Sequence, residues 1–286
     1  MKLVSYLDRT KAAPEPSYGA VVGDSIVDLA TPAAMTLCDG LATEGIDGIA
    51  RRLAKKSSSE GIALSNATLL PPITNPNKIL CVGLNYLLHA QEANLSVPPR
   101  PSVFVRFSSS FVGHEQPVLR PAESEQFDYE AELAVIVGRR ARHVSEAEAM
   151  QVVAGYSCMA ENSVRDWQRH SAQATPGKNF VGSGAFGPWL VTPDEAPAPD
   201  EMTVEGRLNS EIVQRDSCAN MIFSIPHIIA YLSTFTELLP GDVIATGTPA
   251  GVGMSRKPPR YLCDGDVFEV AISGIGALRN LVRNDF

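Results

Sequence analysis

Short hydrophobic runs separated by turn residues dominate the pattern of this chain. Apolar runs that are bounded by glycine, proline, asparagine or aspartate are typical of β-strands. The run at 133–137 is continuously apolar, which favours a strand buried on both faces. The expected strands are 2–6, 19–22, 25–29, 79–82, 103–107, 133–137, 153–159, 189–191, 242–246, 267–272 and 278–282.

Few segments show the spacing of a helix. The expected helices are 35–56, with breaks at Gly40 and Gly45, then 147–152, 163–170 and 225–236. Ser145 and Glu148 have the spacing of a capping box, and Ser163 is placed to cap a helix through His170. Strands do not alternate regularly with helices, so a doubly wound parallel sheet is not expected. We predict a mainly β (α+β) fold with sheets packed or rolled on each other.

The length of 286 residues suits one large domain, or one domain with a small appendage. The proline-rich segment 71–76 has the composition of a linker. We therefore expect a small N-terminal domain over 1–75 and a second domain over 76–286.

Composition and charge narrow the class of function. The net charge is −8 and no Lys/Arg cluster stands out, so a nucleic-acid partner is not expected. No apolar run approaches the length of a membrane span, and the first residues lack the core of a signal peptide. The five cysteines are scattered, with no C-x-x-C pair, which is typical of reduced thiols. We expect a cytoplasmic protein with no membrane partner.

Glu130 and Glu132 lie at the start of the apolar run 133–137. Residues i and i+2 of a strand point to the same side, so both carboxylates project together. Burying two like charges without a partner is costly, and a hard divalent cation with oxygen ligands removes that cost. The pair indicates either a metal site or a solvated acidic edge.

Other candidate residues also allow two interpretations. Glu161 ends an apolar strand, where it fits a third metal ligand or an acid at a helix N-terminus. His89 and Glu92 are three residues apart, so on a helix they form either a water-activating pair or a surface ion pair. Lys178 lies in a turn-rich segment, where it stabilises an oxyanion or is merely solvated.

The glycine-rich segment 246–253 follows an expected strand. Glycines let the backbone approach a ligand closely, and exposed N–H groups with Thr248 could hold a carboxylate. A tight structural turn is the alternative.

Four segments, taken in order, resemble the fumarylacetoacetate hydrolase family, and the resemblance extends from Lys78 to Arg283. They are Ile-Leu-Cys-Val-Gly-Leu-Asn-Tyr at 79–86 followed by His89 and Glu92, Tyr-Glu-Ala-Glu-Leu at 129–133, Ser-Val-Arg-Asp-Trp-Gln at 163–168, and Thr-Gly-Thr-Pro-Ala-Gly-Val-Gly at 246–253. The resemblance implies a rolled, mixed β-sandwich as the catalytic domain, a small N-terminal domain, and a homodimer.

The resemblance also implies a metal site. Members of the family bind one Mg²⁺ or Mn²⁺ through a Glu-x-Glu…Asp pattern, which places the metal on Glu130, Glu132 and Glu161. Two positions depart from the family: Glu161 replaces an aspartate, and Arg106 stands where a lysine is expected.

The implied reaction is hydrolysis of a C–C bond in an acylpyruvate or β-diketo acid of the fumarylpyruvate or maleylpyruvate type. Pyruvate and a carboxylic acid are the products, as in the catabolism of aromatic compounds. The resemblance assigns catalysis to His89, Glu92 and Lys178, and binding of a small anionic keto acid to Arg106, Arg165, Gln168 and Thr248. Oxaloacetate-type decarboxylation, dienoate isomerisation or hydration, and ligand binding without catalysis are the alternatives.

Overall fold

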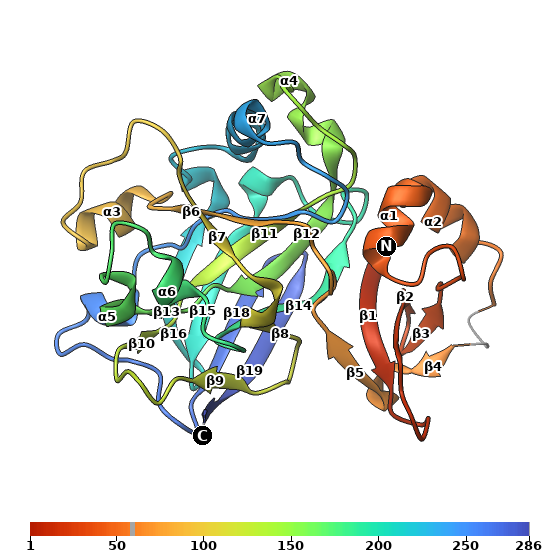
Figure 1. Ribbon diagram of the computed structural model, residues 1–286, viewed down its shortest axis with the longest axis horizontal. Helices are drawn as coiled ribbons and strands as arrows, with labels where there is room; N and C mark the ends of the chain where they lie inside the picture. The colour runs from red at the N-terminus through yellow and green to blue at the C-terminus, as the bar shows by residue number, and fades with distance from the viewer. Residues whose placement is uncertain (58–60, 286) are drawn as a thin grey trace.

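The computed structural model describes residues 1–57 and 61–285 of the chain (Figure 1). A twelve-stranded mixed sheet forms the centre, with its main path in the order β4-β3-β2-β1-β14-β12-β11-β17-β6-β7. Its strands are β1 (Lys2–Asp8), β2 (Pro16–Val22), β3 (Ser25–Asp28), β4 (Ile62–Ala63), β5 (Ala67–Leu70), β6 (Ile79–Gly83), β7 (Ser102–Arg106), β8 (Phe111–Val112), β11 (Ala131–Val137), β12 (Val153–Ala160), β14 (Gly184–Val191) and β17 (Val243–Ala245).

A five-stranded sheet with the order β16-β15-β18-β19-β9 packs against β11, β12 and β14 of the large sheet. A third, two-stranded sheet joins β10 to β13. The strands of these smaller sheets are β9 (Val118–Arg120), β10 (Phe127–Asp128), β13 (Ser163–Val164), β15 (Thr203–Leu208), β16 (Glu211–Ser217), β18 (Val267–Ile272) and β19 (Gly276–Asn284). The expected mainly β fold with packed sheets is confirmed.

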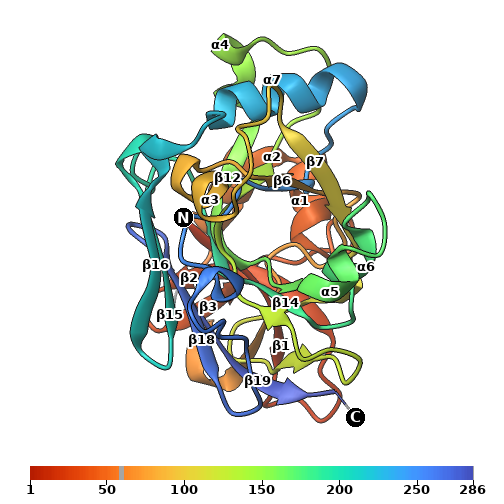
Figure 2. The same cartoon turned by 90° about the vertical axis from the view of Figure 1, so that its left-hand side faces the viewer.

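Short helices border the sheets. They are α1 (Leu37–Thr43), α2 (Gly45–Leu53), α3 (Leu87–Glu92), α4 (Glu146–Ala149), α5 (Arg165–Gln168), α6 (Thr175–Lys178) and α7 (Ile225–Phe235), and the 3-10 turns are η2 (Leu64–Asn66), η3 (Ser108–Ser110), η4 (Met150–Val152), η5 (Pro199–Glu201), η6 (Cys218–Asn220) and η7 (Gly253–Ser255). Helices α3, α5 and α6 gather at one end of the molecule, far from α1 and α2 (Figures 1 and 2). Within the described ranges, no helix is long and apolar enough to cross a membrane.

The apolar run of β11 is explained by burial on both faces. Leu133 and Val135 belong to the core between the two large layers, whereas Ala134 and Ile136 belong to a second core that includes residues of α1 and α2. Every residue of β11 is buried, as expected for a strand with apolar side chains at successive positions. Glu132 therefore lies on the same face of the strand as Ala134 and Ile136.

The structure corrects two expected local features and adds one. Ser163 does not cap a helix: it lies in β13 and donates a hydrogen bond to Glu130, while α5 begins at Arg165. Gly40 does not break the first helical segment, whereas the expected break at Gly45 is confirmed, because α1 ends at Thr43 and α2 begins at Gly45. The hairpin of β15 and β16 was not expected, because the charged residues of β16 hide its alternation. The helix at 225–236 and the capping box at Ser145 are confirmed.

Residues 1–57 and 61–70 form one side of the molecule: strands β1 to β5 with α1 and α2 lie beside the rest (Figure 1). Within the twelve-stranded sheet β1 connects this part to β14, through the pairs Lys2↔Val191 and Leu3↔Leu190. The expected boundary near residue 75 falls in the connection between β5 and β6, and the division into two domains stays a prediction.

Strands β12 and β14 approach so closely at Gly155 that a side chain does not fit. A Cβ at Gly155 would overlap the carbonyl oxygen of Val191. We expect Gly155→Ala to lower the free energy of unfolding by about 1–3 kcal/mol, because the backbone of β14 at Val191 must move to make room for the new methyl group. Chemical denaturation measures the change. In the control Gly83→Ala, the nearest atom to the new Cβ is 3.7 Å away, so an equal loss in both variants would contradict this explanation.

Candidate functional site

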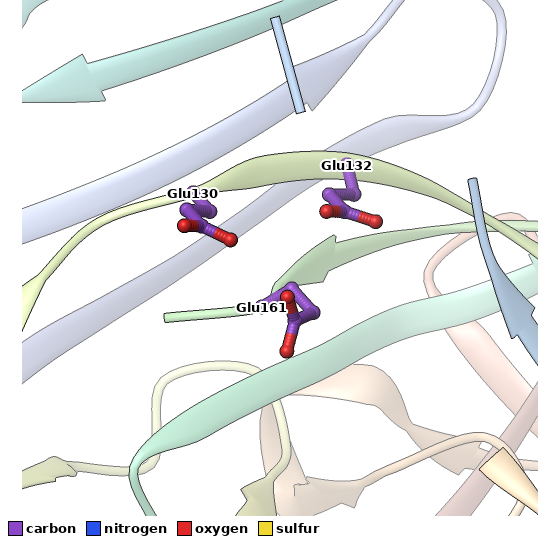
Figure 3. A group of neighbouring side chains, drawn as sticks. All are labelled: Glu130, Glu132 and Glu161. Atoms are coloured by element: carbon purple, nitrogen blue, oxygen red, sulfur yellow. The ribbon is translucent and has the colours of Figure 1, made fainter. Parts of the chain in front are cut away.

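Three buried carboxylates meet at the junction of β11 and β12. Glu130 and Glu132 flank Ala131, which pairs with Ala160 at the end of β12, so that Glu161 comes to face both. The backbone N–H of Glu161 donates to the carbonyl of Glu130 at 2.9 Å. One carboxylate oxygen from each residue lies within 4.8 Å of the others. Figure 3 shows the three carboxyl groups converging from the two strands.

Two cations from neighbouring helices contact these acids. The ammonium of Lys178, at the end of α6, donates to Glu130 at 2.8 Å and also to the carboxylate of Glu161. Arg165, the first residue of α5, pairs with Glu130 and donates to Asp128 at 2.8 Å. All of these side chains are buried, so each charge depends on its partners rather than on water.

The three acids differ in the direction of their pKa shifts because their partners differ. Burial raises the pKa of Glu132 well above its usual range, and the charges of Glu161 and Glu130 raise it further. Burial also raises the pKa of Glu161, against the effect of its cationic partners. Burial acts on Glu130 in the same direction, but Arg165 and Lys178 outweigh it and lower the pKa of that carboxyl. Glu132 is thus the acid whose charge is least compensated by the protein.

This donor set fits a hard divalent cation. Three carboxylates converge, and among the described residues no histidine or cysteine belongs to the group. Within the same residues Glu132 accepts one hydrogen bond, from the N–H of Gly247 at 2.8 Å. Mg²⁺ and Mn²⁺ prefer such oxygen ligands. Glu130, Glu132 and Glu161 would hold the ion, and its charge would replace the proton on Glu132.

A second functional group faces the same cavity from α3. Nδ1 of His89 and Oε1 of Glu92 are 2.8 Å apart, and His89 is almost fully buried. The other oxygen of Glu92 accepts the N–H of Gly251 at 2.9 Å, which ties α3 to the glycine-rich segment. Because Glu92 is fixed at both oxygens, it orients the imidazole and favours the tautomer with the proton on Nδ1.

The glycine-rich segment 246–253 is held against β11, the strand that begins beside Glu130. Thr248 Oγ1 donates to the carbonyl of Ala131 at 3.0 Å. The buried amide of Gln214 donates to Thr248 and accepts the N–H of Ala131, at 2.8 and 2.9 Å. Gly247 requires φ of +107°, which only glycine adopts readily. The segment therefore positions β11 as well as lining the cavity.

Two residues of this arrangement escaped the sequence analysis. Asp128 is fully buried and accepts the N–H groups of Gly253 and Met254 at 2.7 and 3.1 Å, together with the guanidinium of Arg165. Gln214 lies in β16, a strand that was not expected. Asp128 directly precedes the Tyr-Glu-Ala-Glu string, and that neighbourhood was the available signal; nothing in the sequence around Gln214 marks it.

A cavity of about 430 Å³ unites the site. Among the residues expected to act, those lining it are His89, Glu130, Glu132, Glu161, Arg165, Gln168, Lys178 and Thr248. Glu92 lies directly behind His89. Lys178 ends a short helix, α6, rather than lying in an irregular loop.

Arg106 is the exception: it contacts an acid of the cluster and does not line the cavity, and its expected contact with substrate stays a prediction. Its guanidinium lies behind Glu161, which it contacts at 3.0 Å, and it also donates to Ser110, Ser183 and the carbonyl of Asn162. It stacks on Phe111 at 4.3 Å and does not line the cavity. Arg106 thus supports the longer acid at position 161: the two departures from the family pattern contact each other.

Comparison with known proteins gives a consistent result. The family model described as fumarylacetoacetate (FAA) hydrolase C-terminal matches residues 78–283. Oxaloacetate tautomerase Fahd2a, mitochondrial, of Rattus norvegicus is 39% identical over 287 residues, covering 99% of this chain and 91% of the rat protein.

Two solved structures extend the comparison. Fumarylacetoacetate hydrolase from Exiguobacterium antarcticum aligns with a TM-score of 0.85 at 34% identity, covering both chains fully. Maleylpyruvate hydrolase from Sphingobium sp. SYK-6, in complex with manganese (II) ion and pyruvate, aligns over both full chains with a TM-score of 0.81 at 27% identity. These relatives are enzymes, and the chain belongs to the fumarylacetoacetate hydrolase family.

Proposed function

We propose that this protein is a metal-dependent enzyme that interconverts the keto and enol forms of an oxaloacetate-type 2-oxo acid. The observation that supports this most directly is the placement of an oriented imidazole and a cation-binding acid cluster around one cavity. Keto–enol conversion requires a base beside a carbon atom and a positive charge beside the neighbouring oxygen.

His89 is the group that moves the proton. With Nδ1–H held by Glu92, Nε2 carries the lone pair and takes a proton from the carbon next to the keto group. Returning the proton to the oxygen completes the isomerisation without a net change in atoms. A negative Glu92 stabilises the imidazolium that forms between the two steps.

A bound Mg²⁺ or Mn²⁺ supplies Lewis-acid polarisation of the keto group. The protein's own contribution is to orient the three carboxylates and to place the ammonium of Lys178 next to Glu130 and Glu161. Gln168 and Thr248 line the cavity and offer polar contacts to a substrate carboxylate. Arg165 contacts Asp128, Gln168 and Glu130. Because its guanidinium already has these partners, we assign it to positioning the site rather than to binding the substrate.

The oxaloacetate tautomerases of rat and human, each 39% identical to this chain, support this choice of reaction. Their alignments cover 99% and 92% of the chain. Several of these relatives carry the word mitochondrial in their names, and a cytoplasmic location for this chain stays a prediction.

Hydrolysis of an acylpyruvate to pyruvate and a carboxylic acid is the second candidate. Here His89 and Glu92 would deprotonate water rather than carbon, and the water would attack the distal carbonyl. The maleylpyruvate hydrolase with bound manganese and pyruvate favours this reaction, because its fold matches over the whole chain. A homodimer, and the absence of a nucleic-acid partner, stay predictions for either activity.

Removal of the imidazole should separate catalysis from metal binding. We expect His89→Ala to lower kcat for oxaloacetate tautomerisation about 100-fold or more, because the proton acceptor is lost. Mn²⁺ affinity should stay unchanged, since His89 is not a ligand. Ultraviolet absorbance of the enol follows turnover, and calorimetry follows Mn²⁺ binding. Wild-type protein that releases pyruvate from maleylpyruvate or fumarylpyruvate, but leaves oxaloacetate untouched, would favour the hydrolase instead.

Metal binding should depend on pH in a defined direction. The raised pKa of Glu132 means that this acid holds a proton where an ordinary glutamate is ionised. A cation must displace that proton, so Mn²⁺ affinity should rise with pH above the ordinary glutamate range, with about one proton released per ion. Calorimetry in buffers of different ionisation enthalpy counts the protons.

The neutral variant Glu132→Gln should lose most of its Mn²⁺ affinity and release no proton. Glu115→Gln is the matched control, because its side chain is 71% exposed and distant from the acid cluster. Tight, pH-independent binding by Glu132→Gln would remove Glu132 from the ligand set.

A further inference from the structure

Arg169 is a cation of the cavity that no part of the proposed mechanism uses. It follows directly after α5, lines the same cavity as the three acids and is exposed at its surface. Within residues 1–57 and 61–285, its guanidinium has neither an ion pair nor a hydrogen bond. An arginine carries its charge throughout the working pH range and presents a fork that matches a carboxylate.

The other cations of the site are already committed to protein groups. Lys178 donates to two carboxylates and to the carbonyl of Glu161, which accounts for all three of its protons. Arg165 contacts Asp128, Gln168 and Glu130, and Arg106 lies outside the cavity. An additional anionic group of a substrate therefore needs a different partner.

The charges of the site lead to the same conclusion. Around the inner part of the cavity lie four buried carboxylates (Asp128, Glu130, Glu132 and Glu161) and three buried cations (Arg106, Arg165 and Lys178). The cations pair with Asp128, Glu130 and Glu161, whereas Glu132 forms no ion pair within residues 1–57 and 61–285. A divalent ion leaves this group with one net positive charge, which a single substrate carboxylate neutralises. A second carboxylate would be uncompensated in the inner part of the cavity, and it requires a counter-charge nearer the opening.

We propose that Arg169 binds the distal carboxylate of the substrate and so selects a dicarboxylic over a monocarboxylic 2-oxo acid. This inference rests on the proposed function and adds to it a residue that determines specificity. Arg165 and Arg169 are separated by one helical turn, about 5–6 Å between Cβ atoms. The second carboxylate would thus lie one turn from the acid cluster.

Apolar side chains that line the cavity make the contact selective. Leu84, Leu95, Phe104 and Met254 line the same cavity. A dicarboxylate held across this wall loses water around its tail, which strengthens its pairing with a guanidinium. A monocarboxylic acid of equal length forms no ion pair with Arg169, which then stays solvated. The difference in affinity between the two acids therefore depends on the distal carboxylate.

Two ligands of equal carbon number test this directly. 2-Oxoglutarate and 2-oxopentanoate share the 2-oxo acid group and differ only in the terminal carboxylate, which is a methyl group in 2-oxopentanoate. Calorimetry on the Mn²⁺-loaded protein should show about tenfold tighter binding of 2-oxoglutarate. Arg169→Gln should abolish this preference by weakening 2-oxoglutarate alone, and Arg169→Lys should retain part of it.

Arg51→Gln, which removes the same charge from an exposed position on α2, is the control and should keep the preference. If Arg169→Gln keeps the tenfold ratio, or weakens both ligands equally, Arg169 is only a solvated surface residue and the inference fails. Wild-type protein without any preference would overturn it as well.

The measurement does not require turnover, so the two proposals can fail separately. If the preference depends on Arg169 but the protein does not tautomerise oxaloacetate, the dicarboxylate site stands and the proposed reaction fails. If the protein tautomerises oxaloacetate but Arg169→Gln leaves the ligand preference unchanged, the proposed reaction stands and the role of Arg169 fails.

Discussion

The mutual compensation of buried charges at the β11–β12 junction is the constraint on which the rest of the site depends. Glu130, Glu132 and Glu161 are almost entirely removed from water, and their repulsion is opposed by Lys178 and Arg165. Removing one member of such a buried set costs about 3–5 kcal/mol, because the remaining charge is left without a partner. Each cation lies at the end or start of a short helix, so the charges also fix where α5 and α6 lie.

The same charges connect catalytic groups that are distant in the sequence. Asp128 joins Arg165 to the backbone of Gly253, and Glu92 joins α3 to Gly251. The glycine-rich segment thus receives a carboxylate from two different directions, and through Gly247 it donates to Glu132 itself. The His89–Glu92 pair, the acid cluster and the glycine-rich segment form one hydrogen-bonded network, so a shift in the position of one of them changes the positions of the others.

Much of this was accessible from the sequence, for physical reasons that differ between elements. The strand at 133–137 was visible because a doubly buried strand is apolar at every position, and the His89–Glu92 contact was visible because residues three apart share a helical face. The contacts of Arg106 could not be predicted, because its neighbours in space, Glu161 and Ser183, come from distant segments of the chain. Strand β16 carries Gln214 but was hidden by its exposed, charged positions.

The sequence by itself determined the mainly β fold, the family, and the two glutamates that share one face of a strand, because these follow from local periodicity and from short motifs. Only the tertiary structure decided which cations pair with those acids. Pairing of charges depends on distances between segments far apart along the chain, and spacing within a motif does not contain them. For that reason only the structure shows that Arg106 contacts Glu161, and that Arg169, which no motif marks, lines the cavity with no ion pair among the described residues.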